Sequence, residues 1–270
     1  MKILTIANHK GGCAKTTIAL NVAVTFAASG SKVLAIDLDP QGNLSASLGV
    51  DLQTLEETRL TSHRLMLDES GDFSNYKATV RPRLDIVPSC IDADAEALLD
   101  SQAVSRELLL KQKLAPAFPA YDYCIIDTPP SLRTPTLNAL AMSDLTIVPI
   151  ESSMFALLGL TQLLRTITKV RKAHAPDMFV MALSTIYTAR QNLDRTIRDK
   201  VIERFTEDFV FNTTIPRAVA IGEATATMQA VVEADADSPA TFAFRKLSQE
   251  IKEVLTNEQQ DETKAQRNAR

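Results

Sequence analysis

Short runs of apolar residues alternate along this chain with longer stretches in which apolar residues recur every three or four positions. A continuously apolar run of about four to eight residues is typical of a buried parallel strand. We predict such strands at Lys2–Asn8, Val33–Ile36, Leu84–Val87, Tyr123–Ile126, Leu145–Ile150 and Phe179–Leu183. Strands that alternate with helices form a parallel sheet with helices on both faces. The expected fold is therefore α/β, a single doubly wound domain with a mainly parallel sheet.

The helical stretches are marked by apolar residues that fall on one face. Ile18, Val22 and Phe26 follow the first strand at a four-residue spacing, which predicts a helix there. Further helices are predicted from Leu160, Leu164 and Ile167, from Leu193, Ile197, Val201 and Phe205, and from Ala243, Leu247, Ile251 and Leu255. Ser238 and Pro239 supply an N-cap and a first-turn proline for the last of these.

The chain is expected to divide into one folded unit, residues 1–256, and a polar tail, residues 257–270. From Asn257 onward no apolar side chain is larger than alanine, so we expect the tail to be disordered. Residues 51–82 show no clear periodicity. The chain has no apolar run of about 18 residues and opens without a secretory signal, so we expect a cytoplasmic protein that does not bind membranes.

The composition excludes several classes of protein. Of 270 residues, 45% are hydrophobic and 23% are charged, which is the balance of an ordinary globular protein. Lys and Arg number 29 against 33 Asp and Glu, so the net charge of −4 rules out a globally basic nucleic-acid coat but not a local basic face. Cys13, Cys90 and Cys124 form no CxxC pair, so neither a disulfide framework nor a four-thiolate metal site is expected.

A glycine-containing loop lies between the first predicted strand and the first predicted helix. Its sequence, from Asn8 to Thr17, is NHKGGCAKTT. A polyphosphate binds where backbone N–H groups, a helix N-terminus and a lysine converge. We expect Lys15 to reach the β- and γ-phosphates of a nucleotide, Thr16 to offer its hydroxyl to Mg²⁺, and Thr17 to meet the α-phosphate.

The loop departs from the standard pattern GxxxxGK[ST], and it carries a second lysine, Lys10, before Gly11 and Gly12. The segment Lys10-Gly11-Gly12-Cys13-Ala14-Lys15-Thr16-Thr17 resembles the deviant Walker A box of the ParA/MinD superfamily of P-loop ATPases. The resemblance implies that Lys10 crosses a nucleotide-sandwich homodimer to the partner's phosphates. Ala14 stands where the family usually has Gly; since Ala is favourable at a helix start, we expect the backbone donors of the loop to be kept.

Two further segments resemble the switches of this family. Asp37-Leu38-Asp39-Pro40-Gln41 follows the second strand, and Asp127-Thr128-Pro129-Pro130 follows the strand that begins at Tyr123. An acid at the carboxyl end of a strand beside a phosphate loop is placed to orient water or a hydrated Mg²⁺. By the resemblance, Asp39 positions the attacking water, Asp37 helps with the metal, and Asp127 holds Mg²⁺ through water.

A segment near residue 216 resembles the family's adenine-binding block. Pro216 and Arg217 follow Ile215, and Glu223-Ala224 comes shortly after. The family usually has Asn where this chain has Ala218. Pro216 and Arg217 are therefore assigned either to contacts with the base or to a structural turn.

The resemblance also implies a function. Its members hydrolyse ATP slowly until a ParB-like or other adaptor protein stimulates them. Their ATP dimers bind nonspecific DNA on the nucleoid, and the cycle segregates plasmids or chromosomes or positions a protein assembly. A site that lacks one cationic group loses about 10³ to 10⁵ in rate until a partner supplies an arginine.

The charge distribution offers candidate DNA contacts. Residues 165–217 carry ten Lys or Arg against six Asp or Glu, an excess of +4 that leaves −8 for the rest of the chain. On the helix predicted from Leu193, three arginines avoid the apolar positions and are candidates for phosphate contacts: Arg195, Arg198 and Arg204. The four-residue spacing of Asp194 with Arg198 equally suits an ordinary surface ion pair. Arg245 and Lys246 on the last helix form a second candidate patch.

Other functions are weighed against this one. A MinD-like regulator needs an amphipathic C-terminal helix with a bulky apolar face, which the tail from Asn257 does not supply. An iron–sulfur relative needs paired cysteines at a dimer interface. A metabolic P-loop enzyme needs residues for a substrate domain, and one sheet nearly exhausts this chain.

Overall fold

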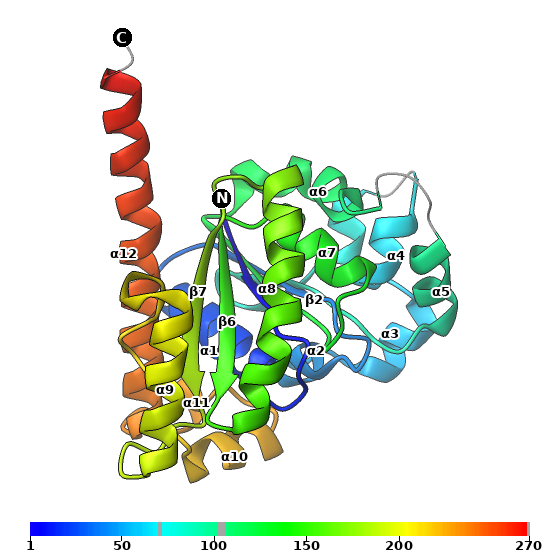
Figure 1. The fold of residues 1–270 in the computed structure, drawn as a ribbon. Coiled ribbons are helices and arrows are strands. Elements are labelled where there is room, and N and C mark those ends of the chain that lie inside the picture. The colour runs from blue at the N-terminus through cyan, green and yellow to red at the C-terminus, as the bar shows by residue number, and fades with distance from the viewer. Residues whose placement is uncertain (70–71, 102–105, 269–270) are drawn as a thin grey trace.

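The computed structural model describes residues 1–69, 72–101 and 106–268, with the side chains of 154–158 and of 257 onward left out. Within these residues one sheet has the order β3-β4-β2-β5-β1-β6-β7 (Figure 1). The strands are β1 (Lys2–Ile6), β2 (Val33–Asp37), β3 (Ala78–Arg81), β4 (Leu84–Val87), β5 (Tyr123–Asp127), β6 (Leu145–Glu151) and β7 (Phe179–Thr185). β3 pairs antiparallel with β4, and the other pairings are parallel. The predicted doubly wound α/β fold is thus confirmed.

Helices connect the strands. They are α1 (Lys15–Ala28), α2 (Asn43–Ser47), α3 (Leu52–Thr58), α4 (Ser62–Leu67), α5 (Ala93–Ser101), α6 (Leu109–Leu114), α7 (Thr134–Ala141), α8 (Met154–His174), α9 (Asn192–Phe205), α10 (Val219–Ala226), α11 (Val231–Ala234) and α12 (Pro239–Asn268). Short 3₁₀ turns lie at Phe73–Tyr76, Ala115–Ala120 and Glu207–Phe209.

The strands alternate their side chains between two helical layers. Leu4 and Ile6 of β1 pack on the side that holds α1, α11 and α12, whereas Ile3 packs on the opposite side with α4, α6 and α7. α8 and α9 cover that opposite side near β6 and β7. Because both faces are covered, the central strands are buried at nearly every position and not at every second one.

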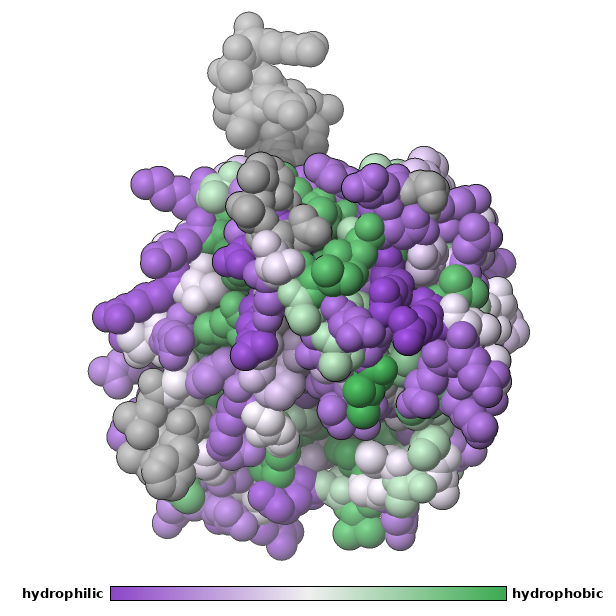
Figure 2. Space-filling view, turned by 90° about the vertical axis from the view of Figure 1, so that its right-hand side faces the viewer, coloured by the Kyte–Doolittle hydropathy of each residue, from purple (hydrophilic) through white to green (hydrophobic). Residues whose placement is uncertain are grey.

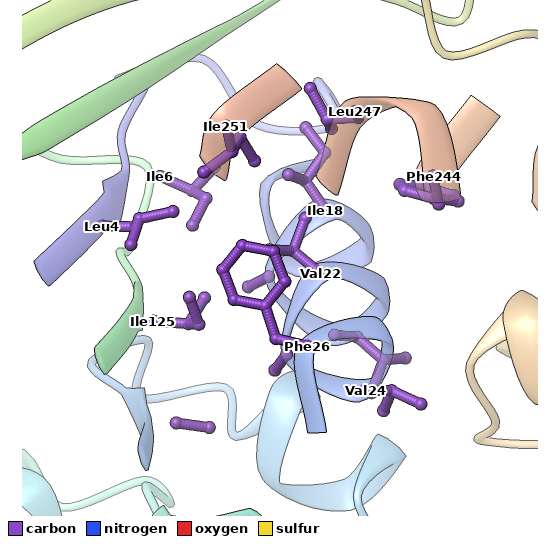
Figure 3. Packing of buried hydrophobic residues seen from close by; sticks show 14 of the residues in the cluster. Leu4, Ile6, Ile18, Val22, Val24, Phe26, Ile125, Phe244, Leu247 and Ile251 are labelled. Carbon is purple, nitrogen blue, oxygen red and sulfur yellow. The ribbon is translucent and has the colours of Figure 1, made fainter. Parts of the chain in front are cut away.

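The core of the first layer lies around α1. Phe26 is fully buried between the sheet and α12, and its ring centroid is 4.5 Å from that of Tyr123. Figure 3 shows Phe26 between Ile125 of β5 and the α12 residues Phe244 and Ile251. This packing holds α1 against the face of the sheet that includes β1, and it therefore holds both ends of the loop that joins them.

Several details differ from the predictions. β3 lies in the segment 51–82, where the sequence shows no clear pattern. In α9, Ile197 and Val201 are buried as expected, but Leu193 is 50% exposed. The first turn of α9 instead buries Asp194, whose Oδ2 accepts the Thr188 N–H at 2.5 Å.

The tail expected to be disordered continues α12 as far as Asn268. Residues 257–268 are Asn, Glu, Gln, Asp, Thr, Lys, Ala and Arg, with no Gly or Pro, and several of these are strong helix formers. Helix propensity therefore extends α12 past the end of its apolar stripe. Residues 269–270 of the predicted tail lie outside the described residues. At the other end, the Ser238 hydroxyl accepts the Thr241 N–H at 3.1 Å, which confirms the predicted N-cap.

None of the helices in the described part of the chain is both long and apolar enough to cross a bilayer.

Candidate nucleotide site

The loop between β1 and α1 contains two residues in the left-handed region. Gly12 has φ +74°, and Ala14, which precedes α1, has φ 71° and ψ 28°. A residue with a Cβ rarely adopts this conformation, whereas glycine does so freely. The expectation that Ala14 sits favourably at a helix start is therefore wrong. Its backbone is left-handed, so helix propensity does not apply, and glycine would suit this position.

Lys15 is the first residue of α1 and is 7% exposed. Its Nζ donates to the Lys10 carbonyl oxygen at 3.2 Å, so the ammonium is folded over the loop. The loop is also fixed from β7, since the Thr185 hydroxyl donates to the Cys13 carbonyl at 3.2 Å. Burial raises the pKa of the Cys13 thiol, so this residue contributes through its backbone.

Lys10 contacts residues at the start of α8. Its Nζ makes an ion pair with Glu151 and donates to the Ser153 hydroxyl at 3.0 Å. The sequence suggests Ser152 or Ser153 only as a cap of the following helix, and Glu151 was not predicted as a site residue. Glu151 could have been found, because it ends β6 as Asp37 ends β2 and Asp127 ends β5.

Thr16 and Asp127 form the part of the site that suits a metal. The Thr16 hydroxyl donates to Asp127 Oδ2 at 2.6 Å, and Asp127 Oδ1 is buried without a hydrogen-bond partner among the described residues. Burial and the nearby Asp37 raise the pKa of Asp127 well above its usual range. A hydroxyl beside a carboxylate with a free oxygen fits Mg²⁺, which usually keeps several waters and binds through one or two carboxylates plus substrate phosphates.

Asp37 fixes the first switch. Its Oδ1 accepts the Asp39 N–H at 3.0 Å, and its Oδ2 accepts the Ser45 N–H at 2.9 Å and the Ser45 hydroxyl at 2.8 Å. Burial is the main cause that raises the pKa of Asp37. The predicted contact of Asp37 with a metal would use an Oδ1 that already accepts one hydrogen bond.

One cavity brings the separate segments together. It has a volume of about 520 Å³ and is lined from the loop (Gly11, Gly12, Ala14, Lys15, Thr16, Thr17), the first switch (Asp39, Gln41), Pro130, and the segment that includes Pro216 and Arg217. Asp39 is 8% exposed, and its Oδ1 accepts the Gln41 N–H at 3.0 Å. Lys10 is not among the described residues that line this cavity.

The segment at Pro216 is held against β7 by backbone bonds. Ile215 N–H donates to the Ser184 carbonyl at 2.9 Å, and Arg217 N–H donates to the Tyr187 carbonyl at 3.1 Å. This arrangement is the turn that the sequence offered as one alternative. It also places Pro216 and Arg217 on the cavity wall, so the turn and a contact with a base are compatible.

The candidate DNA residues differ in how they are held. Arg198 is half-buried, and its guanidinium donates to the Ser184 hydroxyl and to the Phe211 carbonyl, both at 3.2 Å. Two of its N–H groups are thus engaged within the chain, and its predicted contact with DNA phosphate stays a prediction. Asp194, its alternative ion-pair partner, instead accepts the Thr188 N–H. Arg195 and Arg204 are exposed, although Arg195 Nε donates to the Ala189 carbonyl at 2.8 Å and Arg204 donates to the Thr161 hydroxyl at 3.4 Å. Arg245 and Lys246 are exposed on α12, about where the sequence placed them.

His9 joins the loop to α8. A Cβ at Gly159 would lie 2.0 Å from the His9 Cε1 atom, so the ring occupies the space that any side chain at 159 would need. The loop is thus packed directly on α8 and is not a free surface turn.

Three features define a P-loop nucleotide-binding protein. The first strand of a parallel sheet leads into a glycine-containing loop, a Lys-Thr pair begins the helix that follows, and an acid stands at the end of a neighbouring strand. The AAA domain family matches residues 1–180, and the chain belongs to this family.

Relatives with established names match nearly the whole chain. The sporulation initiation inhibitor protein Soj of Bacillus subtilis is 34% identical over 251 residues, which cover 93% of this chain and 98% of Soj. The chromosome partitioning protein ParA of Caulobacter vibrioides is 35% identical over 268 residues, 98% of each chain. The chain is thus similar to the partitioning ATPases, and the resemblance to ParA-type proteins is confirmed.

Solved structures agree on the fold. A cobyrinic acid a,c-diamide synthase from Mycobacterium smegmatis, with bound ADP and magnesium, has a TM-score of 0.78 and 33% identity and covers 92% of both chains. The ATP complex of a Cyanothece McdA variant has a TM-score of 0.81 and 23% identity, and the match covers 95% of this chain and 96% of that one. The second likeness shows the fold alone.

Proposed function

We propose that this chain is a ParA-type positioning ATPase whose ATP-bound homodimer binds nonspecific DNA and segregates or spaces a cargo. ATP and Mg²⁺ are the cofactors of the site. The observation that carries the proposal is the different placement of two lysines. Lys15 lines the nucleotide cavity, whereas Lys10 does not line it and makes an ion pair with Glu151. A lysine of the loop that does not line the cavity of its own subunit is available to contact the nucleotide phosphates of a second subunit.

The residues on the cavity can perform phosphoryl transfer to water. Lys15 needs to leave only the Lys10 carbonyl to meet the β- and γ-phosphates, and Thr17 lies beside the α-phosphate position at the start of α1. When bound at Thr16 and Asp127, Mg²⁺ neutralises charge on the phosphates. Asp39, held by the Gln41 N–H, orients the attacking water.

Lys10 contacts a nucleotide only after it leaves its ion-pair and hydrogen-bond partners within its own chain. In the single chain it is held by Glu151 and Ser153, and in the proposed dimer it leaves them for the triphosphate of the other subunit. We expect hydrolysis to be slow in the absence of a stimulating protein, because a site that lacks one cationic group at the transition state loses rate until a partner supplies it. A ParB-like or other adaptor that supplies a cationic side chain raises the rate.

For the contacts with DNA, we propose four exposed cationic side chains. Arg195, Arg204, Arg245 and Lys246 are exposed to solvent, whereas Arg198 is engaged within the chain. The binding is electrostatic, so it weakens steeply with salt. In a cell the ATP-bound dimer then resides on the nucleoid, and the ADP-bound chain is free in the cytoplasm.

The experiment is to measure the mass of the protein by light scattering in saturating Mg·ATP. Asp39→Ala should bind ATP without hydrolysing it and remain a dimer, Asp39→Ala with Lys10→Ala should bind ATP as a monomer, and Lys15→Ala should not bind ATP. A monomeric Asp39→Ala protein in saturating ATP contradicts the proposal.

The same proteins test the DNA step. Asp39→Ala should be retained on a DNA column in ATP, and Arg195→Ala with Arg204→Ala should lower that retention without changing ATP affinity. Arg198→Ala is the matched control, since its guanidinium is bound inside the chain. If the rate of ATP hydrolysis did not change with DNA but rose with a small carboxylic acid, the result would favour a synthase activity.

A further inference from the structure

A groove lies at the edge of the sheet, away from the nucleotide cavity. It has a volume of about 510 Å³, and it runs between the segment 75–80, which includes β3, and the segment 48–60, which includes α3. Among the described residues, the linings of the groove and of the nucleotide cavity have none in common. The larger apolar side chains of the groove are Leu48, Val50, Leu55, Leu60, Tyr76 and Val80, and Ala78 and Pro88 also line it.

One wall of the groove is an edge strand. β3 pairs with β4 on one side and, within the described residues, with no strand on the other. Ala78 and Thr79 are exposed. An edge strand presents unpaired N–H and C=O groups, which an extended segment of another chain can satisfy.

The opposite wall is apolar and acidic. Leu60 is 39% exposed at the mouth of the groove, Asp51 lines it, and Glu56 and Glu57 are exposed on α3. Lys77 does not offset these charges, because its ammonium donates to Asp85 Oδ2 at 2.6 Å. Arg59, exposed at the end of α3, offsets one of the three, which leaves an excess of two acids on this wall. The acidity extends beyond the groove, since residues 51–100 hold eleven Asp or Glu against five Lys or Arg.

The molecule is therefore polarised, with its basic excess in residues 165–217 and an acidic excess in residues 51–100. Figure 2 looks onto the side of the molecule to which α3 and α5 belong, and it shows green apolar side chains set among purple polar ones. Apolar side chains on an acidic surface favour a partner that is apolar and basic.

We propose that the groove between β3 and α3 binds an extended segment of a partner protein in which apolar and basic residues alternate, added as a strand to the free edge of β3. Its apolar side chains fill the space beside Leu55, Leu60 and Val80, and its basic side chains face Glu56 and Glu57. Binding here requires no nucleotide.

The probe is a fluorescein-labelled nine-residue peptide of alternating lysine and valine, with a glutamate–valine peptide as its counterpart. Both are titrated by fluorescence anisotropy against the full nucleotide-free chain. The lysine peptide should bind at least about tenfold more tightly than the glutamate peptide and should weaken as salt is raised. Hydrogen exchange should show new protection at residues 78–80 on binding.

Two variants locate the contact. Leu60→Ser should weaken the lysine peptide by about fivefold through lost apolar burial, whereas Leu98→Ser, an exposed leucine of α5 outside the groove, should not. Glu56→Gln with Glu57→Gln should also weaken it, and Glu207→Gln with Asp208→Asn, exposed just beyond the end of α9, is the matched charge control. All of these positions are exposed, so the variants should keep the melting temperature of the parent.

Several results would overturn the proposal: equal binding of the two peptides, protection that appears elsewhere than residues 78–80, or equal effects of Leu60→Ser and Leu98→Ser. A nucleotide-free dimer that Leu60→Ser dissociates would assign the groove to a second copy of the chain and would likewise overturn it. Lys15→Ala should bind the lysine peptide as the parent does, so a failure of the ATPase proposal leaves this test intact.

Discussion

Ala14 offers a direct test of the loop conformation, because replacing it with glycine should stabilise the protein. At φ 71° and ψ 28° an alanine is strained by about 1–2 kcal/mol relative to a right-handed conformation. Glycine removes that strain but makes the unfolded chain more flexible, which costs about 0.4–1 kcal/mol. The difference between the midpoints of these ranges predicts that Ala14→Gly raises the free energy of unfolding by about 0.8 kcal/mol, within limits of about 0 and 1.6 kcal/mol.

The assay is urea denaturation in the absence of nucleotide, followed by circular dichroism. Ala97→Gly is the matched control: Ala97 is exposed in the interior of α5, where the same substitution should lower stability by about 1 kcal/mol. The two variants thus make the same chemical change with opposite expected signs. If Ala14→Gly destabilises the protein as much as Ala97→Gly does, the left-handed assignment of Ala14 is refuted.

Three further perturbations test other parts of the structure. Glu151→Gln removes the ion-pair partner of Lys10, a contact worth up to about 1 kcal/mol. Because the homodimer releases two such contacts, the substitution should tighten ATP-dependent dimerisation of Asp39→Ala by up to about thirtyfold in sedimentation experiments; a weaker dimer would show that Glu151 does not hold Lys10 back. Burial lowers the pKa of His63 to about 4. The unfolded chain therefore binds this proton first, and the contribution of His63 to the free energy of unfolding should fall by up to about 3 kcal/mol from pH 6.5 to pH 4, whereas Asp37 and Asp127, whose pKa values are raised, contribute with the opposite sign. The free energy of unfolding of His63→Gln minus that of the parent should therefore rise by this amount over the same range in urea denaturation, and a constant difference would exclude His63 as a titrating group. Phe26→Ala should cost about 3–5 kcal/mol in urea denaturation, because the side chain is fully buried; a loss below about 1 kcal/mol would contradict the packing of α1 against α12.

The sequence predicted the sheet well where strands are buried on both faces. Val33 and Leu84 begin β2 and β4 as expected, since continuous apolar runs mark such strands clearly. β3 was missed because it is a short edge strand with exposed Ala78 and Thr79, so burial imposes no pattern on it. Edge strands depend on pairing with a neighbour, and pairing leaves little trace in a single sequence.

For the site, motif spacing identified the loop and the acids, and Lys15, Thr16 and Asp39 do line one cavity. The spacing of motifs could not predict which residues form hydrogen bonds with each of these side chains. The hydrogen bonds of Asp37 to Ser45, and those of Arg198 to Ser184 and Phe211, depend on how distant segments pack. The left-handed backbone at Ala14 was likewise hidden, because alanine suggests a helix.

The close packing of His9 on Gly159 has a mechanical consequence. With no room for even a methyl group between them, the loop cannot shift without pushing on α8. This helix runs for 21 residues, from Met154 to His174, which is about 30 Å at the rise of an α-helix. A displacement of the loop toward α8 would therefore press on a helix whose residues Leu160, Leu163 and Ile167 are buried against β6 and β7.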